Sequence, residues 1–351
     1  MSYASASRTS SPGPFRRRGS REGKCPAAER IPTPLLDCAD NRPKTRSARR
    51  GATMREFSGK TAVVTGAASG MGYAFAERFA AEGMNVVLAD IETDALSAAV
   101  TRLEQQEHNV IGVEVNTMRR ETLENVRDQA IDRFGKIHVL CNNAGVTSRR
   151  DGGLGSGVGA VPVWEVPDST WDWVMGVNFW GVLYGLQVFV PSMLEHGEAG
   201  HIVNTASVAG LIPGASAYSV SKHGVLTLTE GLWHHLRTAD SSVSASVLCP
   251  GFVNTQINEA ERNRPSEFGQ SIEANEAQRA ASRIFLGGGM DPSDVAELVW
   301  QAMVNDQLYI LPHDGWRDII RGRVESVLEG QQPVEVDFQK MMERRAQGEY
   351  V

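Results

Sequence analysis

The amino-acid sequence predicts an α/β fold, with a parallel sheet of about seven strands and helices on both faces of that sheet. Three observations support this fold class. The composition, 41% hydrophobic and 22% charged, is ordinary for a globular protein. Short apolar runs alternate with helix-length segments from Lys60 onward. Because crossovers between parallel strands are right-handed, such units wind into a single doubly wound, Rossmann-type domain.

The individual elements follow from hydrophobic runs and their flanking residues. Apolar runs of strand length lie at 62–64, 85–90, 110–115, 137–141, 201–206, 243–248 and 308–311. Helical segments lie at about 72–82, 93–106, 121–134, 168–195 and 315–328. A further helix is expected to start at Ser216, and another at Asp291 and Pro292, where aspartate caps and proline fits the first turn. Pro191 is expected to bend or end the long helix.

We expect the domain to span residues 54–330, between two segments of different composition. Residues 1–53 hold 12 Lys and Arg against 4 Asp and Glu, a net charge of +8, and 6 of the 15 prolines. Such a basic, Ser- and Pro-rich extension is expected to be disordered. A natural start at Met54 is the favoured explanation for it, and a transit peptide or a basic tract for anionic surfaces are the alternatives. Residues 331–351 form a charged tail, and residues of about 252–290 form a mobile lid.

The charge balance and the cysteines exclude several classes. The whole chain carries −7, so the part after residue 53 carries −7 − 8 = −15. This acidity argues against a nucleic-acid partner. No apolar run reaches membrane-spanning length, and the scattered histidines predict no metal site. Cys141 and Cys249 lie in predicted strands, as expected for reduced thiols of a cytoplasmic protein.

Ser207, Tyr218 and Lys222 form the most informative stretch. Tyr218 and Lys222 are four residues apart, so on a helix they share one face. An ammonium about 5 Å from the phenol, at an effective dielectric of about 20, favours the phenolate by roughly 3 kcal/mol. The pKa of Tyr218 is then expected at about 7 to 8, where a general acid–base group works best. Ser207 could donate to a carbonyl oxygen beside it.

A glycine-rich turn follows the first strand. Gly66, Gly70 and Gly72, in the sequence TGAASGMG, let the backbone approach a pyrophosphate at a helix N-terminus. Asp90 ends the second strand, where its carboxylate can accept hydrogen bonds from a ribose diol and repel a 2′-phosphate. With no Lys or Arg in the turn or directly after Asp90, the expected cofactor is NAD rather than NADP.

The ordered set of motifs resembles the short-chain dehydrogenase/reductase family over about residues 57–311. Its landmarks here are the glycine turn at 65–72, Asn-Asn-Ala-Gly at 142–145, Asn178, Ser207, Tyr218 with Lys222, and Pro250-Gly251 followed by Thr255.

The resemblance implies a role for each matching residue. Tyr218 is the acid–base group, Ser207 the donor to the substrate oxygen, and Lys222 a ligand of the nicotinamide ribose. Asn178 holds a water that links Lys222 to solvent, and Asn142 and Gly145 line the adenine and ribose side. The cofactor-binding set implied is Gly66, Ser69, Gly70, Met71, Gly72, Asp90, Asn116, Asn143, Ala144, Gly145, Tyr218, Lys222, Pro250, Gly251, Val253 and Thr255.

Two features depart from the family pattern. Asn116 stands where an aspartate is usual beside the adenine, which weakens that contact without removing it. The interval from Ser207 to Tyr218 is eleven residues, about two fewer than is common. Thr205 therefore remains an alternative to Ser207.

The predicted function is an NAD-dependent interconversion of a secondary alcohol and a ketone. The alternative is a catalytically silent dinucleotide-binding protein with the same fold. The predicted lid mixes polar residues with apolar ones, which suits a medium to large apolar alcohol or ketone; the apolar residues are Phe252, Ile257, Phe268, Ile284 and Phe285. The apolar surplus on the predicted helices around Asn178–Met193 and Gly224–Leu236, by analogy with the family, predicts a homodimer or homotetramer.

Overall fold

The computed structural model describes residues 54–151, 161–270, 276, 286–333 and 336–348. The predicted extension at 1–53 and part of the predicted lid, at 271–275 and 277–285, lie outside the described residues.

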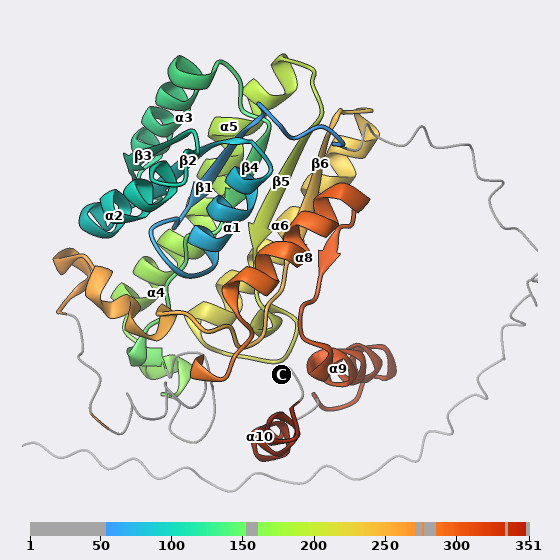
Figure 1. Ribbon diagram of the computed structural model, residues 1–351. Helices are drawn as coiled ribbons and strands as arrows, with labels where there is room; N and C mark the ends of the chain where they lie inside the picture. The colour runs from blue at the N-terminus through green and yellow to red at the C-terminus, as the bar shows by residue number, and fades with distance from the viewer. Residues whose placement is uncertain (1–53, 152–160, 271–275, 277–285, 334–335, 349–351) are drawn as a thin grey trace, which may run out of the picture. The chain divides into compact units, whose positions relative to one another are not determined.

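Seven parallel strands form one sheet in the order β3-β2-β1-β4-β5-β6-β7 (Figure 1). The chain therefore winds outward in one direction from β1 to β3 and in the other from β4 to β7, which confirms the doubly wound fold. The strands are β1 (Thr61–Thr65), β2 (Asn85–Asp90), β3 (Val110–Glu114), β4 (Val139–Asn142), β5 (Gly200–Thr205), β6 (Val243–Leu248) and β7 (Tyr309–Ile310).

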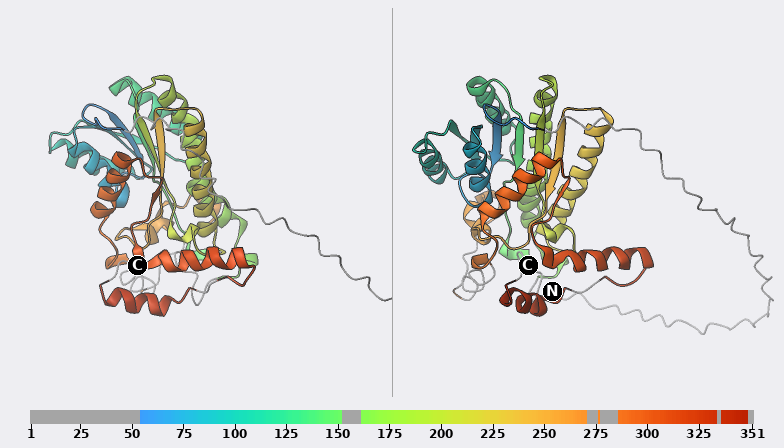
Figure 2. Two further views of the ribbon diagram at one scale, coloured as in Figure 1. Left: turned by 90° about the vertical axis from the view of Figure 1, so that its right-hand side faces the viewer. Right: turned by 45° about the vertical axis from the view of Figure 1, so that its right-hand side comes forward.

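Helices cover both faces of the sheet, because successive strand residues point to opposite sides. On one side, Val64 and Leu88 pack with α1 (Gly70–Ala81), α2 (Thr93–Glu104) and α8 (Pro292–Asn305). On the other side, Val63 and Val87 pack with the remaining layer. That layer consists of α3 (Arg120–Phe134), α5 (Gly181–Glu195) and α6 (Ala217–Thr238). The turned view in Figure 2 shows the sheet between the two layers.

The helix predicted at 168–195 is continuous but not uniform. It consists of α4 (Asp168–Met175), a π-helical turn (Gly176–Trp180) and α5. Pro191 lies inside α5 without ending it, so the prediction of a helix end there was wrong. The interruption comes earlier, at the wider π turn, which contains Asn178.

This helix also corrects the membrane analysis. Its 28 residues are long and apolar enough to cross a membrane, although no single apolar run in the sequence suggested it. Side chains such as Trp173, Val182, Phe189 and Met193 are buried in the protein. We therefore interpret it as a core helix of the domain.

Two sequence-level start signals are present as predicted. The Ser216 hydroxyl accepts a hydrogen bond from the backbone N–H of Ser219 at the start of α6. Asp291 accepts one from Ser293 before α8, with Pro292 in the first turn. Each side chain satisfies a donor that the helix leaves open.

The chain after residue 330 is more than the charged tail that we predicted. After α9 (Arg317–Glu329), a further helix, α10 (Phe338–Ala346), places Met341 in a buried cluster with Val208 and Trp316. The helix was missed because charged residues interrupt its short sequence, Phe338–Ala346. Arg344 also donates to the carbonyl of Gly315 at 3.0 Å.

The segment predicted as a lid is closed at its base. Val253 and Met290 form a parallel β-bridge. Two backbone hydrogen bonds of 3.0 Å support the bridge, from Asn254 to Met290 and from Met290 to Phe252. The lid therefore leaves and returns to the domain at one point.

Candidate active site

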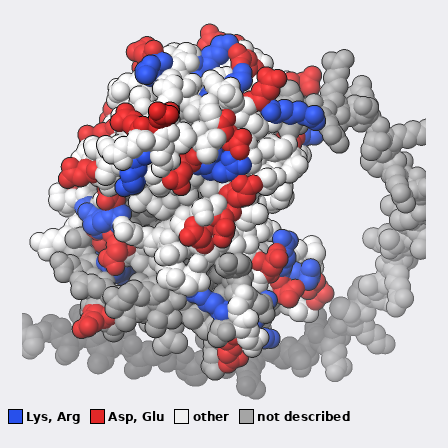
Figure 3. All heavy atoms as spheres, viewed as in Figure 1, with Lys and Arg blue, Asp and Glu red and all other residues white. Residues whose placement is uncertain are grey.

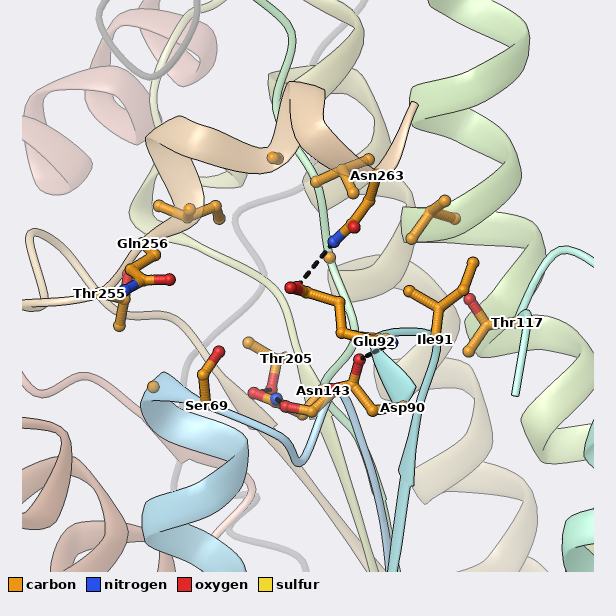
Figure 4. A pocket seen from close by; sticks show the side chains of 18 of the residues that line it. Ser69, Asp90, Ile91, Glu92, Thr117, Asn143, Thr205, Thr255, Gln256 and Asn263 are labelled. Atoms are coloured by element: carbon orange, nitrogen blue, oxygen red, sulfur yellow. Dashed lines mark hydrogen bonds between the residues drawn. The ribbon is translucent and has the colours of Figure 1, made fainter. Parts of the chain in front are cut away.

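A cleft opens at the carboxyl ends of the strands, where ligands bind in open α/β sheets (Figure 4). Its walls come from the turn after β1, the ends of β2 and β3, the loop after β4, the start of α6 and the lid. Of the residues predicted from the sequence, those that line it are Gly66, Ser69, Gly70, Met71, Asp90, Asn116, Asn143, Ala144, Gly145, Tyr218, Lys222, Pro250 and Thr255.

The glycine turn requires glycine for two physical reasons. Gly66 and Gly70 have φ values of 67° and 55°, which disfavour side chains. Gly72 does not line the cleft, in contrast to its predicted contact. A Cβ atom there would lie 2.0 Å from the Gly66 carbonyl oxygen. Its role is therefore close packing of turn against helix.

Asp90 is held at the end of β2 by the backbone around it. Its two carboxylate oxygens accept hydrogen bonds from the N–H groups of Ala68, at 2.8 Å, and Glu92, at 3.0 Å. Burial raises the pKa of this carboxyl, and the two hydrogen bonds oppose that rise. The carboxylate is thus fixed beside the glycine turn.

The two adjacent asparagines after β4 point to different places. The Asn143 amide donates to the Thr65 carbonyl at 3.1 Å and lines the cleft. Asn142, which we expected on the adenine side, is buried away from the cleft and donates to Asn204 at 2.9 Å. The prediction for Asn142 was wrong because neighbouring strand residues face opposite sides.

Asn178 fixes the same loop from the π turn. Its carboxamide accepts from the Val146 N–H at 2.8 Å and donates to the Val146 carbonyl at 2.9 Å. It also donates to the Ser221 hydroxyl at 3.1 Å. These contacts hold the loop that carries Gly145, beside which the Lys222 ammonium lies.

Tyr218 and Lys222 lie on the first turns of α6, as their spacing predicted. Both are buried, and the Lys222 Nζ lies 5.6 Å from the centroid of the Tyr218 ring. Lys222 also donates to the Thr205 carbonyl at 2.8 Å. The Ser207 hydroxyl donates to the Pro250 carbonyl at 3.3 Å and lies close enough to the Tyr218 phenol to lower its pKa, whereas the Thr205 hydroxyl donates to Asn143 at 3.3 Å. This arrangement favours Ser207 over Thr205 as the partner of the phenol.

The protonation states differ from our expectation. Burial raises the pKa of Tyr218 to about 12, against a smaller opposing effect of the Ser207 hydrogen bond. Burial also lowers the pKa of Lys222 to about 8. The expected value of about 7 to 8 for Tyr218 neglected the desolvation of the phenolate, which exceeds the attraction of the ammonium here.

A second cavity adjoins the first and is lined by three more of the predicted residues. Ser207, Gly251 and Val253 line it rather than the cleft. Its walls are mostly apolar, with Val208, Ile212, Pro213, Phe252, Leu286 and Trp316. Tyr218, Met71, Pro250, Thr255 and Ile257 line both cavities. The tyrosine therefore lies at the junction of the cleft and this second, apolar pocket.

Comparison with known proteins decides the family. A family model described as short chain dehydrogenase matches residues 60–266. The chain belongs to the short-chain dehydrogenases.

Relatives and solved structures agree with this assignment. The chain is 36% identical over 272 residues to 1-deoxy-11-beta-hydroxypentalenate dehydrogenase of Streptomyces exfoliatus, covering 76% of this chain and 88% of the relative. It is 30% identical over 287 residues to the CLA biosynthesis dehydrogenase/reductase of Lactiplantibacillus plantarum, covering 78% and 95%. A short-chain dehydrogenase/reductase from Burkholderia phymatum, solved in complex with NAD, is 41% identical with a TM-score of 0.73, covering 81% of this chain and 99% of that one.

The site of this short-chain dehydrogenase accordingly takes NAD as its cofactor. The residues present fit a dinucleotide. A Cβ atom at Gly66 would lie 2.9 Å from Ala144, so the turn needs glycine here for a ligand to approach its backbone closely. Asp90, at the end of β2, lines the same cleft as Tyr218 and Lys222, which lie beside the end of β5.

Sequence reasoning missed the lid residues that complete this dehydrogenase site. Gln256, Arg262, Asn263 and Pro265 line the cleft from the lid side. No spacing relates them to the motifs, because the lid lacks hydrophobic periodicity.

The described part of the lid is anchored rather than free. Arg264 and Glu261 form an ion pair at 3.5 Å, with side chains 0% and 3% exposed. Ser148 donates to Glu261 at 2.8 Å, and the Arg264 guanidinium lies over the Trp173 ring at 4.9 Å. These contacts join the described part of the lid to the loop after β4 and to α4, and the mobility of the lid stays a prediction.

Proposed function

We propose that this dehydrogenase interconverts a secondary alcohol and a ketone with NAD, with Tyr218 as the acid–base group. The observation that supports this most is the place of the Tyr218 phenol, at the junction of the cofactor cleft and the apolar pocket. A substrate in the pocket then meets phenol and cofactor together.

Each residue has a distinct task in this proposal. When bound, the dinucleotide accepts or donates the hydride. The Tyr218 oxygen takes the hydroxyl proton in oxidation or returns it in reduction. The Ser207 hydroxyl donates to the same substrate oxygen, and Lys222 holds positive charge beside the phenol. Burial of all three excludes bulk water from the proton transfer.

The apolar pocket favours a medium to large apolar substrate. Its lining offers shape and hydrophobic contact with few polar partners, so the reacting oxygen is the main polar contact. Relatives named for a hydroxypentalenate and for a hydroxysteroid are consistent with this size. We place the protein in the cytoplasm, on the strength of its buried free thiols Cys141 and Cys249.

A screen for NAD reduction tests the reaction. Secondary alcohols, sterols, terpenoid alcohols and sugars are offered at pH 8 with NAD and, separately, with NADP. We expect turnover with an apolar secondary alcohol and at least tenfold tighter binding of NAD than of NADP. Turnover confined to sugars would contradict the substrate class, and equal affinities would contradict the preference.

A catalytically silent dinucleotide-binding protein remains the alternative function. The raised pKa of Tyr218 favours it, because a phenol with a pKa of about 12 stays protonated at neutral pH and cannot accept a proton from an alcohol. Tight NAD binding without turnover of any alcohol or ketone in the screen would support this alternative. The proposed reaction therefore requires that the positive charge of the bound oxidised cofactor lower the pKa of Tyr218.

We propose a homodimer or homotetramer that pairs through the long helix and α6. Trp180, at the π turn, is 45% exposed, and Val220 on α6 is 41% exposed. Two large apolar side chains of this kind are costly to leave in water and favour a partner surface. Light scattering at micromolar concentration tests this, and a monomer mass would contradict it.

A further inference from the structure

Glu92 connects the sheet to the lid at the end of the cleft where Asp90 lies. It follows β2 by two residues and precedes α2. Its carboxylate accepts hydrogen bonds from Arg262, at 2.6 Å and 3.2 Å, and from Asn263 at 2.9 Å. Figure 4 shows Glu92 extending across the cleft to Asn263, with Asp90 below it. Two segments some 170 residues apart thus meet over this part of the site.

All three nitrogen atoms of the Arg262 guanidinium donate hydrogen bonds. Its Nε and Nη2 donate to the two carboxylate oxygens of Glu92, and its Nη1 donates to the Gln256 carbonyl at 3.3 Å. Such a two-point contact with a carboxylate has the same geometry that an arginine uses toward a phosphate. Glu92 therefore takes the donors that a phosphate group would need.

Arg262 is well placed to matter for phosphate recognition. Among the described residues that line the cleft, the cations are Arg262 and Lys222. Lys222 lies at the far end, with its ammonium on the Thr205 carbonyl. Arg262 is the cation near Asp90, whose carboxylate is positioned for the ribose diol.

The local charge balance is negative even with Arg262 present. Asp90 and Glu92 bring two carboxylates against one guanidinium. The hydrogen bonds from Arg262 lower the pKa of Glu92, so that carboxyl stays ionised at neutral pH. A phosphate monoester carries about two negative charges at neutral pH, and like charges brought together oppose binding.

We infer that Glu92 is a second determinant of cofactor choice, which selects NAD by adding negative charge beside Asp90 and by occupying Arg262. The inference rests on the proposed use of NAD and deepens it. Asp90 acts through its own charge on the ribose, whereas Glu92 acts through an arginine that would otherwise receive a 2′-phosphate. Removing Glu92 would then free Arg262 to bind the 2′-phosphate of NADP.

Direct titration of both dinucleotides into four proteins and one control variant tests this. The proteins are the wild type, Glu92→Gln, Arg262→Gln and the double variant, and Glu104→Gln serves as the charge-matched control. Glu104 is exposed at the far end of α2. The readout is the ratio of the Kd for NADP to the Kd for NAD, which requires no substrate.

Glu92→Gln should lower this ratio by about tenfold or more, since it removes a charge and frees Arg262 for a charge-assisted contact. The gain should fall with added NaCl, because this rim of the cleft is partly exposed. Arg262→Gln alone should not lower the ratio, the double variant should lose most of the gain, and Glu104→Gln should match the wild type.

Three results would overturn the inference. The ratio could stay unchanged in Glu92→Gln, the whole gain could persist in the double variant, or Glu104→Gln could give the same gain. In each case a wild type that binds NAD leaves the proposed function intact. A wild type that binds neither dinucleotide would overturn the proposed function and the inference together.

Discussion

The two ends of the cleft differ in how far their charged groups are buried. At the catalytic end, Tyr218 and Lys222 are buried and hydrogen-bonded within one compact set of elements. At the Asp90 end, the Glu92 and Arg262 side chains are 29% and 35% exposed and come from distant segments. Lys and Arg side chains lie interspersed with Asp and Glu over the face in Figure 3.

This difference in burial determines whether desolvation or net charge controls the groups at each end. Where water is excluded, desolvation raises the pKa of Tyr218 and lowers that of Lys222, because burial disfavours the charged form of each group. With a pKa of about 8, Lys222 still carries its charge at neutral pH. Where water has access, the groups stay charged and select ligands by charge. Proton transfer and cofactor choice are thereby separated along one cleft.

The largest expected effect comes from removing the phenol oxygen at the buried end. Tyr218→Phe should lower kcat by about 10²- to 10⁴-fold, because the proton transfer loses its carrier. The ring and its packing remain, so the Kd for NAD should change little. Steady-state kinetics and calorimetric titration measure the two quantities. A variant that keeps more than a few per cent of activity would reject Tyr218 as the acid–base group.

Breaking the buried lid anchor should affect stability next most strongly. Arg264→Met leaves the Glu261 carboxylate buried without its guanidinium, which costs about 3 to 5 kcal/mol in the free energy of unfolding. The double variant Arg264→Met with Glu261→Gln should recover much of that loss, since no charge then stays buried. Urea denaturation measures both. Equal stability of single and double variants would show that charge burial is not the cause.

The burial of Lys222 predicts a pH-dependent contribution to stability. Its folded pKa of about 8 lies below its ordinary value of 10.5, so between these pH values the unfolded chain binds more protons. Its contribution is therefore complete above the ordinary pKa and is lost as the pH falls through about 8. The free energy of unfolding of the wild type minus that of Lys222→Met should rise from pH 8 to pH 10. A flat difference over this range would contradict the lowered pKa.

The partly exposed ion pair between Glu92 and Arg262 should contribute least to stability. Arg262→Gln should change the free energy of unfolding by no more than about 1 kcal/mol, as is usual for partly exposed ion pairs. Arg264, two residues further along the lid, is the matched buried case. Urea denaturation of the two single variants in parallel is the measurement. A larger loss for Arg262→Gln than for Arg264→Met would contradict the expectation that the buried ion pair contributes more to stability than the exposed one.

The fold and the motif-bearing parts of the site were accessible from sequence because both depend on local patterns. Apolar runs mark the strands, and the glycine turn, Asp90 and the Tyr218–Lys222 pair each lie within a few residues of a strand end or helix start. The carboxyl ends of parallel strands lie at one edge of the sheet, so these groups were expected to meet.

The rest depends on tertiary environment, which spacing does not encode. Which of Asn142 and Asn143 faces the cleft is set by the exact end of β4. The pKa of Tyr218 depends on burial from several elements at once. The contact between Glu92 and Arg262 joins two polar segments that carry no shared pattern.

The bridge between Val253 and Met290 has a consequence for engineering. Because the two ends of the lid are joined by backbone hydrogen bonds, the sheet is insulated from changes in the sequence between them. Closing a longer segment adds only about 0.6 kcal/mol for each doubling of its length. The interval from 254 to 289 is therefore a natural graft site, where segments from other dehydrogenases could be exchanged to alter substrate range, provided that Arg264 and Glu261 are kept together.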